Sequence, residues 1–463
     1  MTLKVLILVG GETTGTRFRP LSMECPKLLF PLCGKPLVSH IIDNLTDQFP
    51  IDDLEILLMG FFKGQHKTMF QDYIQNVNKS NPDLRIKYLS EPFPLGTAGG
   101  LYHFKDEIFT DSNCKLLMIH GDVICNYPFK DMLEFFEQTK SNITLYGVDP
   151  VSLLKRSQAQ ILVVNGTENG DEAHDDDIVT KFGAIVAERK NSKVVHYVEK
   201  PSSSISEFRQ DSTFEILLNG GIYIFDRSIL DLLTLAEIKK KNSIQFDDGL
   251  DDNDSNDNDN SDNVLSLELD VFKTLPQLDN TNFNVFKSNG FWYQLKLPLS
   301  ALLANNFFLA QSGGTKLSAG VELVQPIQIL TESIAQAKSC KIGPNVSIGK
   351  NVTIGNGVRM VNCIVCDDVT IGDNTIIKNA IIANGTKIGK WCRIEGTITA
   401  SILASNVISS SSAAYMKLLN DIVILCQNTV VHNQVFVYNS VVLPHKELKK
   451  DVKYEIIMWD EEK

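Results

Sequence analysis

The sequence has no apolar run of 18 residues, and its mean hydropathy is −0.04, so a membrane span is excluded. The apolar run at residues 3–9 ends at Gly10 and Gly11 and has no small-residue cleavage site. We therefore expect a first β-strand there and not a signal peptide. The nine cysteines are scattered along 463 residues, which favours reduced thiols in a cytoplasmic protein.

The usual signs of a metal centre are also scarce. Cys363 and Cys366 have CxxC spacing, but no second pair or nearby histidine accompanies them, so buried thiols are favoured over zinc or redox chemistry. Residues 246–263 contain eight aspartates, and their low hydrophobicity predicts a solvated, disordered loop. That loop lacks the spaced glycine and closing glutamate of an EF-hand, which disfavours calcium.

A basic excess is missing as well. Lysine and arginine number 44 against 56 aspartates and glutamates, and the net charge of −12 argues against a nucleic-acid partner. The composition thus favours neither a nucleic-acid nor a membrane partner. The length predicts two or three domains.

The first 125 residues alternate two patterns. Apolar runs predict strands at 4–10, 54–61, 84–90 and 115–120, and residues 36–45 have helical spacing with Leu37, Val38, Ile41, Ile42 and Leu45 on one face. This alternation predicts a largely parallel sheet with helices on both faces. Ligands bind beyond the carboxyl ends of such strands, so the loops at 10–11, 90–100 and 120–122 should meet at one edge.

Four more strands are expected near 142–148, 182–188, 194–200 and 220–226, followed by strand, strand and closing helix over 283–310. We place one domain at 1–310 on this basis. A second domain, at 311–463, has a period of six: Ile342, Ile348, Ile354 and Met360 are six apart, and a glycine follows each isoleucine. The phase resumes at Ile371 and Ile388, which predicts hexapeptide coils of a left-handed parallel β-helix.

Residues 402–420 interrupt the repeat. They are either a tolerated loop insertion or an arm that reaches a partner.

The loops at the sheet edge contain groups that suit a nucleotide sugar. Gly10, Gly11 and Gly15 let the backbone approach phosphate oxygens, and Arg17 and Lys27 can supply positive charge. The small residues at 95–100 fit a purine. Asp122 ends a strand and could hold a metal, while Glu199, Lys200 and Asn219 can hydrogen-bond a sugar.

The order and number of these motifs resemble the sugar-phosphate nucleotidylyltransferases, especially the GDP-mannose pyrophosphorylase (mannose-1-phosphate guanylyltransferase) group. The resemblance covers nearly the whole chain through GTRFRPLS, PKLLFPLCGKP, PLGTAGG, GDVIC, VEKP and NGGIY. It implies an α/β fold with a Rossmann-like nucleotidyltransferase domain, whose sheet is mixed and mostly parallel, before the β-helix. In that group a sugar 1-phosphate oxygen attacks the α-phosphorus of GTP, pyrophosphate leaves, and two aspartates hold Mg²⁺.

The resemblance also implies a set of residues that bind GDP-mannose. They are Gly10, Gly11, Gly15, Thr16, Arg17, Lys27, Leu95, Gly96, Thr97, Gly99, Gly121, Asp122, Gly183, Glu199, Lys200, Asn219 and Gly220.

The sequence departs twice from the active pattern. Three residues, Glu12 to Thr14, separate the glycine pair from Gly15-Thr16-Arg17, where one residue is usual. In FWYQLK, Gln294 stands where the second metal aspartate is expected, and Lys296 stands where glycine is usual. A neutral glutamine lacks the charge that Mg²⁺ favours, so Asp122 is a weak metal ligand and Arg17, Lys27 and Asp122 are vestigial as catalytic residues.

Both departures resemble the alpha-type subunit of this group. That resemblance implies a catalytically inactive chain that binds GDP-mannose, forms homo- and hetero-oligomers with a catalytic beta subunit, and restrains it by product feedback. Mg²⁺ would then be possible but not required, and residues 402–420 would match an insertion that touches the partner.

Two alternatives stay open. One is an active mannose-1-phosphate guanylyltransferase, which would need another carboxylate near Gln294. The other is a scaffold like the gamma or epsilon subunit of the translation-initiation guanine-nucleotide exchange factor. The epsilon type would have an acidic-aromatic helical domain after the β-helix.

Overall fold

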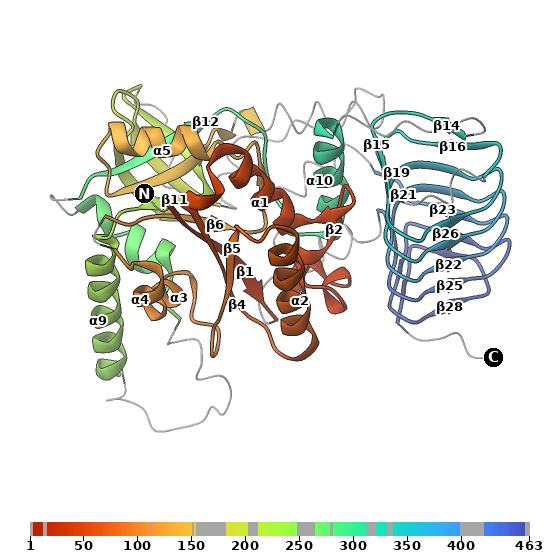
Figure 1. The fold of residues 1–463 in the computed structure, drawn as a ribbon, viewed down its shortest axis with the longest axis horizontal. Helices are drawn as coiled ribbons and strands as arrows, with labels where there is room; N and C mark the ends of the chain where they lie inside the picture. Colours follow the sequence, from red (N-terminus) through yellow and green to blue (C-terminus); the bar gives the residue numbers. More distant parts are fainter. Residues whose placement is uncertain are drawn as a thin grey trace. The chain divides into compact units, whose positions relative to one another are not determined.

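The computed structural model describes residues 3–12, 16–111, 113–150, 152–153, 182–201, 212–247, 264–277, 281–312, 321–330, 337–398 and 421–458 (Figure 1). Packing divides the chain into two compact units. The first comprises Met1–Gly15, Ile41–Leu154 and His174–Trp292, and the second comprises Thr16–His40, Lys155–Ala173 and Tyr293–Lys463. The domain boundary near residue 310 stays a prediction. Packing groups residues 293–310 with the second unit.

A nine-stranded sheet forms the centre of the first unit, with the order β10-β9-β11-β6-β1-β4-β5. In addition, β8 pairs with β11, and β12 pairs with β8. Its strands are β1 (Leu3–Gly11), β4 (Leu54–Phe61), β5 (Arg85–Ser90), β6 (Lys115–His120), β8 (Ile143–Val148), β9 (Gly183–Glu188), β10 (Val194–Glu199), β11 (Phe214–Phe225) and β12 (Phe283–Ser288). Neighbours within β6-β1-β4-β5 are parallel, whereas β11 runs antiparallel to β6, β8 and β9. The predicted mixed sheet and its strands are confirmed.

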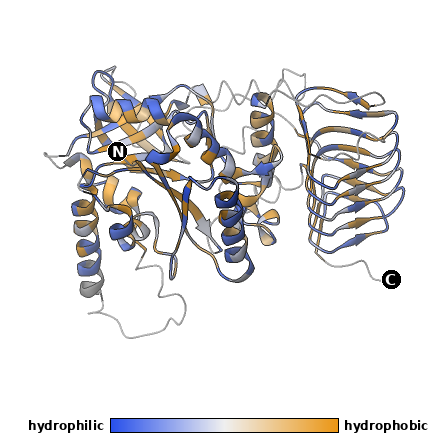
Figure 2. Ribbon diagram, in the orientation of Figure 1, coloured by the Kyte–Doolittle hydropathy of each residue, from blue (hydrophilic) through white to orange (hydrophobic). Residues whose placement is uncertain are grey.

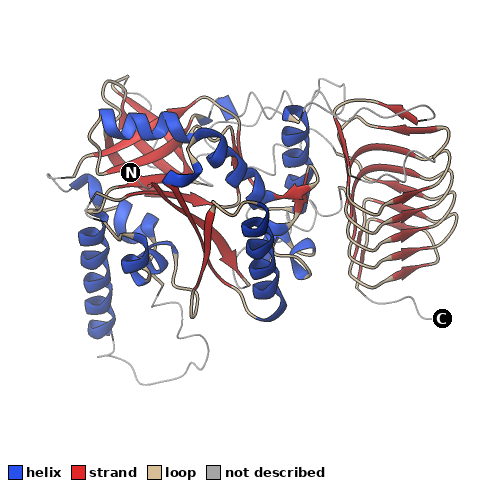
Figure 3. Ribbon diagram, in the orientation of Figure 1, coloured by secondary structure: helices blue, strands red, loops and turns tan. Residues whose placement is uncertain are grey.

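Helices pack against this sheet (Figure 3). They are α1 (Leu37–Gln48), α2 (Gly64–Ser80), α3 (Thr97–His103), α4 (Lys105–Ile108), α5 (Phe129–Gln138) and α9 (Ile229–Asp247). The five apolar residues predicted on one face of α1 are all buried, so that pattern is confirmed. α2 packs against β5, α5 packs against β8 and β11, and α3 packs against α9.

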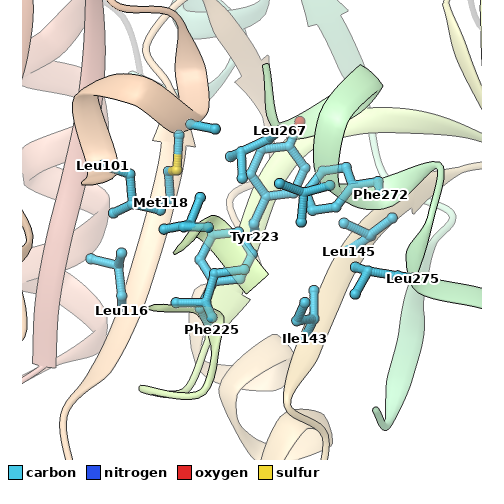
Figure 4. Packing of buried hydrophobic residues seen from close by; sticks show 14 of the residues in the cluster. Leu101, Leu116, Met118, Ile143, Leu145, Tyr223, Phe225, Leu267, Phe272 and Leu275 are labelled. Carbon is cyan, nitrogen blue, oxygen red and sulfur yellow. The ribbon is translucent and has the colours of Figure 1, made fainter. Parts of the chain in front are cut away.

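The core beneath α3 and α9 is rich in aromatic rings (Figure 4). Tyr223 and Phe225 of β11 meet Phe272, which belongs to a short π-helical segment, η5 (Leu267–Phe272). The ring centroids of Tyr223 and Phe272 are 5.3 Å apart, and neither ring is exposed. Burial of each large side chain contributes about 1.5–3 kcal/mol, so η5 is held firmly against the sheet.

The predicted acidic loop at 246–263 is partly wrong at its start, because α9 continues through Asp247. Residues 248–263, Gly15 and the interruption at 402–420 lie outside the described residues. Among the residues that are described, no helix combines the length and the apolar content that a membrane span needs.

Parallel strands stacked coil upon coil build the larger part of the second unit (Figure 3). The predicted inward residues Ile342, Ile348, Ile354 and Met360 are buried, and so are Ile371 and Ile388. Ile354, Ile371 and Ile388 pair across neighbouring coils at intervals of 17 residues, or three repeats less one residue. The expected β-helix is therefore confirmed.

Ile388 next pairs with Val431, 43 residues further on, and Val431 pairs with Leu448 at the regular 17. The interruption therefore adds 26 residues between two coils that remain in register.

The helix α10 (Pro298–Gln311) covers one side of this stack. It packs along β17 (Val346–Ile348), β19 (Arg359–Val365) and β21 (Ile376–Ile382). Ile364 of β19 and Ile381 of β21 are buried, and α10 is largely apolar (Figure 2).

Cys363 and Cys366 lie in this stack as free, buried thiols. Burial raises the pKa of each thiol, so both stay protonated.

Candidate functional site

Three loops of the first unit meet at the carboxyl edge of its parallel strands, as predicted. Leu8 of β1 pairs with His120 of β6, and the next residue, Gly121, donates its N–H to the Leu8 carbonyl over 3.0 Å. The Glu91 N–H after β5 donates to the Gly60 carbonyl of β4, also over 3.0 Å. Residues 10–11, 90–100 and 120–122 therefore share one edge of the sheet.

Gly10 and Gly11 have a packing role at this edge. Gly10 has φ +82°, and the β1–β4 register shifts beside it. A Cβ on Gly11 would lie 2.7 Å from the Phe61 carbonyl oxygen, which is too close for any other residue. These glycines allow β1 and β4 to approach, whatever they bind.

The carboxylate of Glu12 is engaged by the protein itself. Its Oε1 accepts a hydrogen bond from the Lys63 N–H over 2.9 Å, and its own N–H donates to Phe61 O over 3.1 Å. Lys63 immediately precedes α2, where a negative charge is favourable. The lengthened loop thus directs its carboxylate toward α2.

The small-residue loop at 95–100 turns into α3. Gly96 has φ +84°, and a Cβ there would collide with the Leu265 carbonyl oxygen. The N–H groups of Ala98 and Gly99 donate to that same oxygen over 3.0 and 3.1 Å. These two N–H groups therefore already have an acceptor within the protein. A ligand beside this loop would contact the small residues and the Thr97 side chain instead.

Thr97 opens a chain of hydrogen bonds centred on Glu268. Its hydroxyl donates to Glu268 Oε2 over 2.9 Å, and the Ser266 hydroxyl donates to the same oxygen over 2.8 Å. The Tyr223 hydroxyl lies 3.4 Å from Glu268 Oε1 on the other side of the carboxylate. Glu268 therefore joins α3 to β11.

Asn219 continues the chain. Its Oδ1 accepts the Gly221 N–H over 3.1 Å, which directs its amide nitrogen to the hydroxyls of Tyr223 (3.0 Å) and Tyr197 (3.1 Å). The Tyr197 hydroxyl donates to Glu199 Oε2 over 2.9 Å. Burial and the nearby carboxylates raise the pKa of Tyr197, so it remains a donor.

This network connects three predicted residues, Thr97, Asn219 and Glu199, through three that the sequence reasoning missed: Glu268, Tyr223 and Tyr197. The two tyrosines lie on the strands of predicted residues, two and four positions away, so strand alternation offered a signal for them. No local sequence signal points to Glu268, because it follows the aspartate-rich stretch and is 171 residues from Thr97.

His120 borders the network without joining it. Its Nε2 is 3.7 Å from Glu268 Oε1, beyond hydrogen-bond distance, and its ring packs edge-on against Tyr223 with centroids 5.5 Å apart.

Two more predicted glycines have structural neighbours. A Cβ on Gly183 would collide with the Tyr197 hydroxyl, and one on Gly220 would collide with the Tyr146 ring. The Gly220 carbonyl also accepts the Trp292 indole N–H over 2.9 Å.

The remaining predicted residues are divided between the units. Thr16 and Arg17 are exposed in η1 (Thr16–Phe18), and Lys27 begins η3 (Lys27–Leu29), all in the second unit with Gln294. Asp122 lies in the first unit, as does the exposed Lys200. Ligand binding by these residues stays a prediction.

Of the two positions that the resemblance assigns to Mg²⁺, Asp122 has a carboxylate and Gln294 has a neutral amide, whereas Mg²⁺ held by protein favours charged oxygen ligands. Among the described residues, no three His, Cys, Asp or Glu side chains gather closely enough to hold a metal.

Comparison with known proteins assigns the chain to a family. Residues 4–156 match the family model described as Nucleotidyl transferase, and residues 324–458 match the GMPPB C-terminal domain. A probable mannose-1-phosphate guanyltransferase from Schizosaccharomyces pombe is 34% identical over 99% of this chain and 100% of its own length. The human mannose-1-phosphate guanylyltransferase regulatory subunit alpha is 33% identical over 98% and 100%, and its Dictyostelium discoideum counterpart is 30% identical over 99% of each. The chain therefore belongs to the mannose-1-phosphate guanylyltransferase family.

Proposed function

We propose that this chain is a regulatory member of the family, which binds GDP-mannose and restrains a catalytic partner subunit without transferring guanylyl groups itself. The observation that carries the proposal is Gln294, a neutral amide where the second metal carboxylate of an active enzyme is expected. The regulatory-subunit names of relatives that match the full chain support it.

The first unit offers groups suited to a nucleotide sugar. Thr97, Asn219 and Glu199 lie on one hydrogen-bond network, which fixes their side chains before a ligand arrives. Preorganised polar groups bind hydroxyls with less entropic cost. We assign the sugar to this network and the purine to residues 95–100, whereas phosphate binding by Arg17 and Lys27 rests on the resemblance alone.

Loss of one carboxylate should affect catalysis more than binding. Guanylyl transfer builds negative charge on the departing pyrophosphate, and metal charge must offset it in the transition state. Binding of the product GDP-mannose does not need this metal charge, because cationic side chains can hold its phosphates.

The direct test uses the purified chain with Mg²⁺, GTP and mannose 1-phosphate. Pyrophosphate release is followed, and GDP-mannose binding is measured in parallel by calorimetry. We expect saturable binding without turnover. Sustained turnover would establish the active-enzyme alternative, and absence of binding would remove the regulatory proposal.

Gln294→Asp tests whether the missing charge explains the lack of turnover, with Gln294→Asn as the matched neutral control. We expect the aspartate variant to gain Mg²⁺-dependent pyrophosphate release that the asparagine variant lacks. Equal activity of the two variants would show that charge at this position is not the missing component.

The partner in this proposal is the catalytic beta subunit, joined in a hetero-oligomer of the cytoplasm that supplies GDP-mannose for glycosylation. Adding this chain to that subunit should make its activity more sensitive to GDP-mannose. Unchanged sensitivity would contradict feedback control even if binding were found.

A further inference from the structure

The β-helix has one face that differs in charge from the rest of the chain. It is formed by the sheet containing β16 (Cys340–Ile342), β19, β21, β23 (Arg393–Glu395), β26 (Phe436–Tyr438) and β29 (Val452–Lys453). Strand pairing aligns its outward residues in two columns. The columns are Lys341, Arg359, Ile376, Arg393 and Phe436, and Val361, Lys378, Glu395, Tyr438 and Lys453. We call this the basic face.

The basic face has five cations against the carboxylate of Glu395, and Glu322 of the same sheet extends the first column beside Lys341, in a chain whose net charge is −12. Glu395 is held by Arg393, whose Nε and Nη2 lie 3.1 and 3.0 Å from Oε1. At one end, Glu322 of the adjacent strand β14 (Val321–Leu323) pairs with Lys341 over 2.7 Å. The local acidic groups are thus already engaged.

Arg359 and Lys378 are exposed, and neither has an ion-pair partner in the described part of the chain. They lie on neighbouring strands near the middle of the face. The face therefore offers unneutralised positive charge.

Aromatic side chains gather at the other end. The Phe436 ring lies 5.0 Å from Lys453 Nζ and 5.9 Å from the Arg393 guanidinium carbon. The Tyr438 and Tyr454 rings meet edge-on at 5.3 Å, and Tyr454 is 59% exposed. Cation–π contacts hold the basic groups beside an apolar surface.

The other two faces of the coil lack this character. One presents Thr353, Thr370, Lys387, Val430 and Glu447, which balance in charge. The other is apolar and lies under α10, as described above. The basic face is thus the charged side of the stack.

We propose that the basic face docks the aspartate-rich segment, residues 248–263, of a second copy of this chain. That segment has seven aspartates and no lysine or arginine, so its charge complements the face. Six strands at about 4.8 Å spacing span roughly 24 Å, and an extended 16-residue segment reaches about 50 Å. Opposite charges on two surfaces steer their encounter and fix its register, which favours docking between copies.

The first experiment titrates a synthetic peptide of residues 248–263 into a chain from which that segment is deleted. We expect saturable binding at 50 mM NaCl that weakens at least tenfold at 500 mM, because salt screens exposed charges. The double variant Arg359→Glu/Lys378→Glu should weaken binding at least tenfold more. The control Lys350→Glu/Lys387→Glu makes the same charge change away from the face and should shift affinity less than twofold.

The second experiment measures the mass of the full chain by sedimentation. Deletion of 248–263 and the Arg359/Lys378 double variant should each reduce self-association, and combining them should add nothing. Absence of peptide binding, equal loss in the control variant, or an unchanged mass on deletion would each overturn the proposal. Circular dichroism checks folding, and GDP-mannose binding should be unaffected, so this test stands apart from the proposed function.

Discussion

Glu91 is a carboxyl group in surroundings that oppose its ionisation. Burial raises its pKa to about 7 from the ordinary value of 4.5, although a backbone hydrogen bond at Leu95 lowers it in part. Its Oε1 lies against α3, 2.8 Å from where a Cβ on Gly100 would stand. Between about pH 4.5 and 7 the folded chain therefore keeps a proton that the unfolded chain has released.

The consequence is a loss of stability as pH rises through that window, with no further loss above it. Glu91→Gln removes the titrating group. The free energy of unfolding of this variant, relative to that of the parent chain, should therefore increase from pH 5 to pH 8. Urea unfolding at several pH values measures it. Glu134→Gln, on the exposed side of α5, is the control. A constant difference between Glu91→Gln and the parent would contradict the prediction.

Glu268 is the residue on which the polar network depends. Glu268→Gln replaces one acceptor oxygen with an amide donor, which leaves a hydroxyl of Thr97, Ser266 or Tyr223 facing another donor. Hydrogen bonds to charged groups are worth about 1.5–3 kcal/mol, so we expect a stability loss of about 1–2 kcal/mol. GDP-mannose affinity should fall about three- to tenfold as Thr97 loses its orientation. Unchanged calorimetric affinity would remove Glu268 from the site.

Among elements, the β-helix contains a ladder of buried amides. Asn362 Nδ2 donates to Asn379 Oδ1 over 2.7 Å, and Asn379 Nδ2 donates to the Gly396 carbonyl over 2.7 Å. Each coil thus passes a hydrogen bond to the next. Asn379 also has φ +49°, a left-handed conformation that asparagine tolerates better than other non-glycine residues.

Asn379→Ala leaves a donor and an acceptor unsatisfied inside the stack, which should cost about 2–4 kcal/mol. Asn374→Ala is the matched control, because Asn374 has φ +58° but an exposed side chain outside the ladder. It should cost about 1 kcal/mol, from the backbone alone. Denaturant unfolding compares the two, and equal losses would show that the ladder adds nothing.

The elements themselves could be predicted from sequence because their signals are local. Every sixth residue of the repeat faces the coil interior, so the spacing of Ile342 and Ile348 predicts the β-helix without information on residues that are distant in the sequence. The site could be predicted only in part. The glycines at the carboxyl ends of β1 and β6 follow from short motifs, whereas the Thr97–Glu268 contact joins residues 171 apart in the chain. No local pattern encodes that pairing, because tertiary packing alone creates it.

At the scale of the whole molecule, the interruption of the repeat is a tolerated loop or an arm that reaches the partner subunit. The coils on either side stay in register although the chain between them has 26 additional residues. Removing residues 399–420, which are 22 of these, leaves four for a turn. Loop length changes closure entropy only slowly, so we expect a change in stability within about 1 kcal/mol.

The deletion should leave GDP-mannose binding unchanged, because the network that we assign to the sugar lies in the first unit. If residues 399–420 form the arm, the shortened chain should no longer make the catalytic subunit sensitive to GDP-mannose, although the full chain does. Activity of the reconstituted pair, measured across a GDP-mannose titration, separates the cases. Feedback that survives the deletion identifies a tolerated loop. A full chain that gives no feedback removes the regulatory function itself.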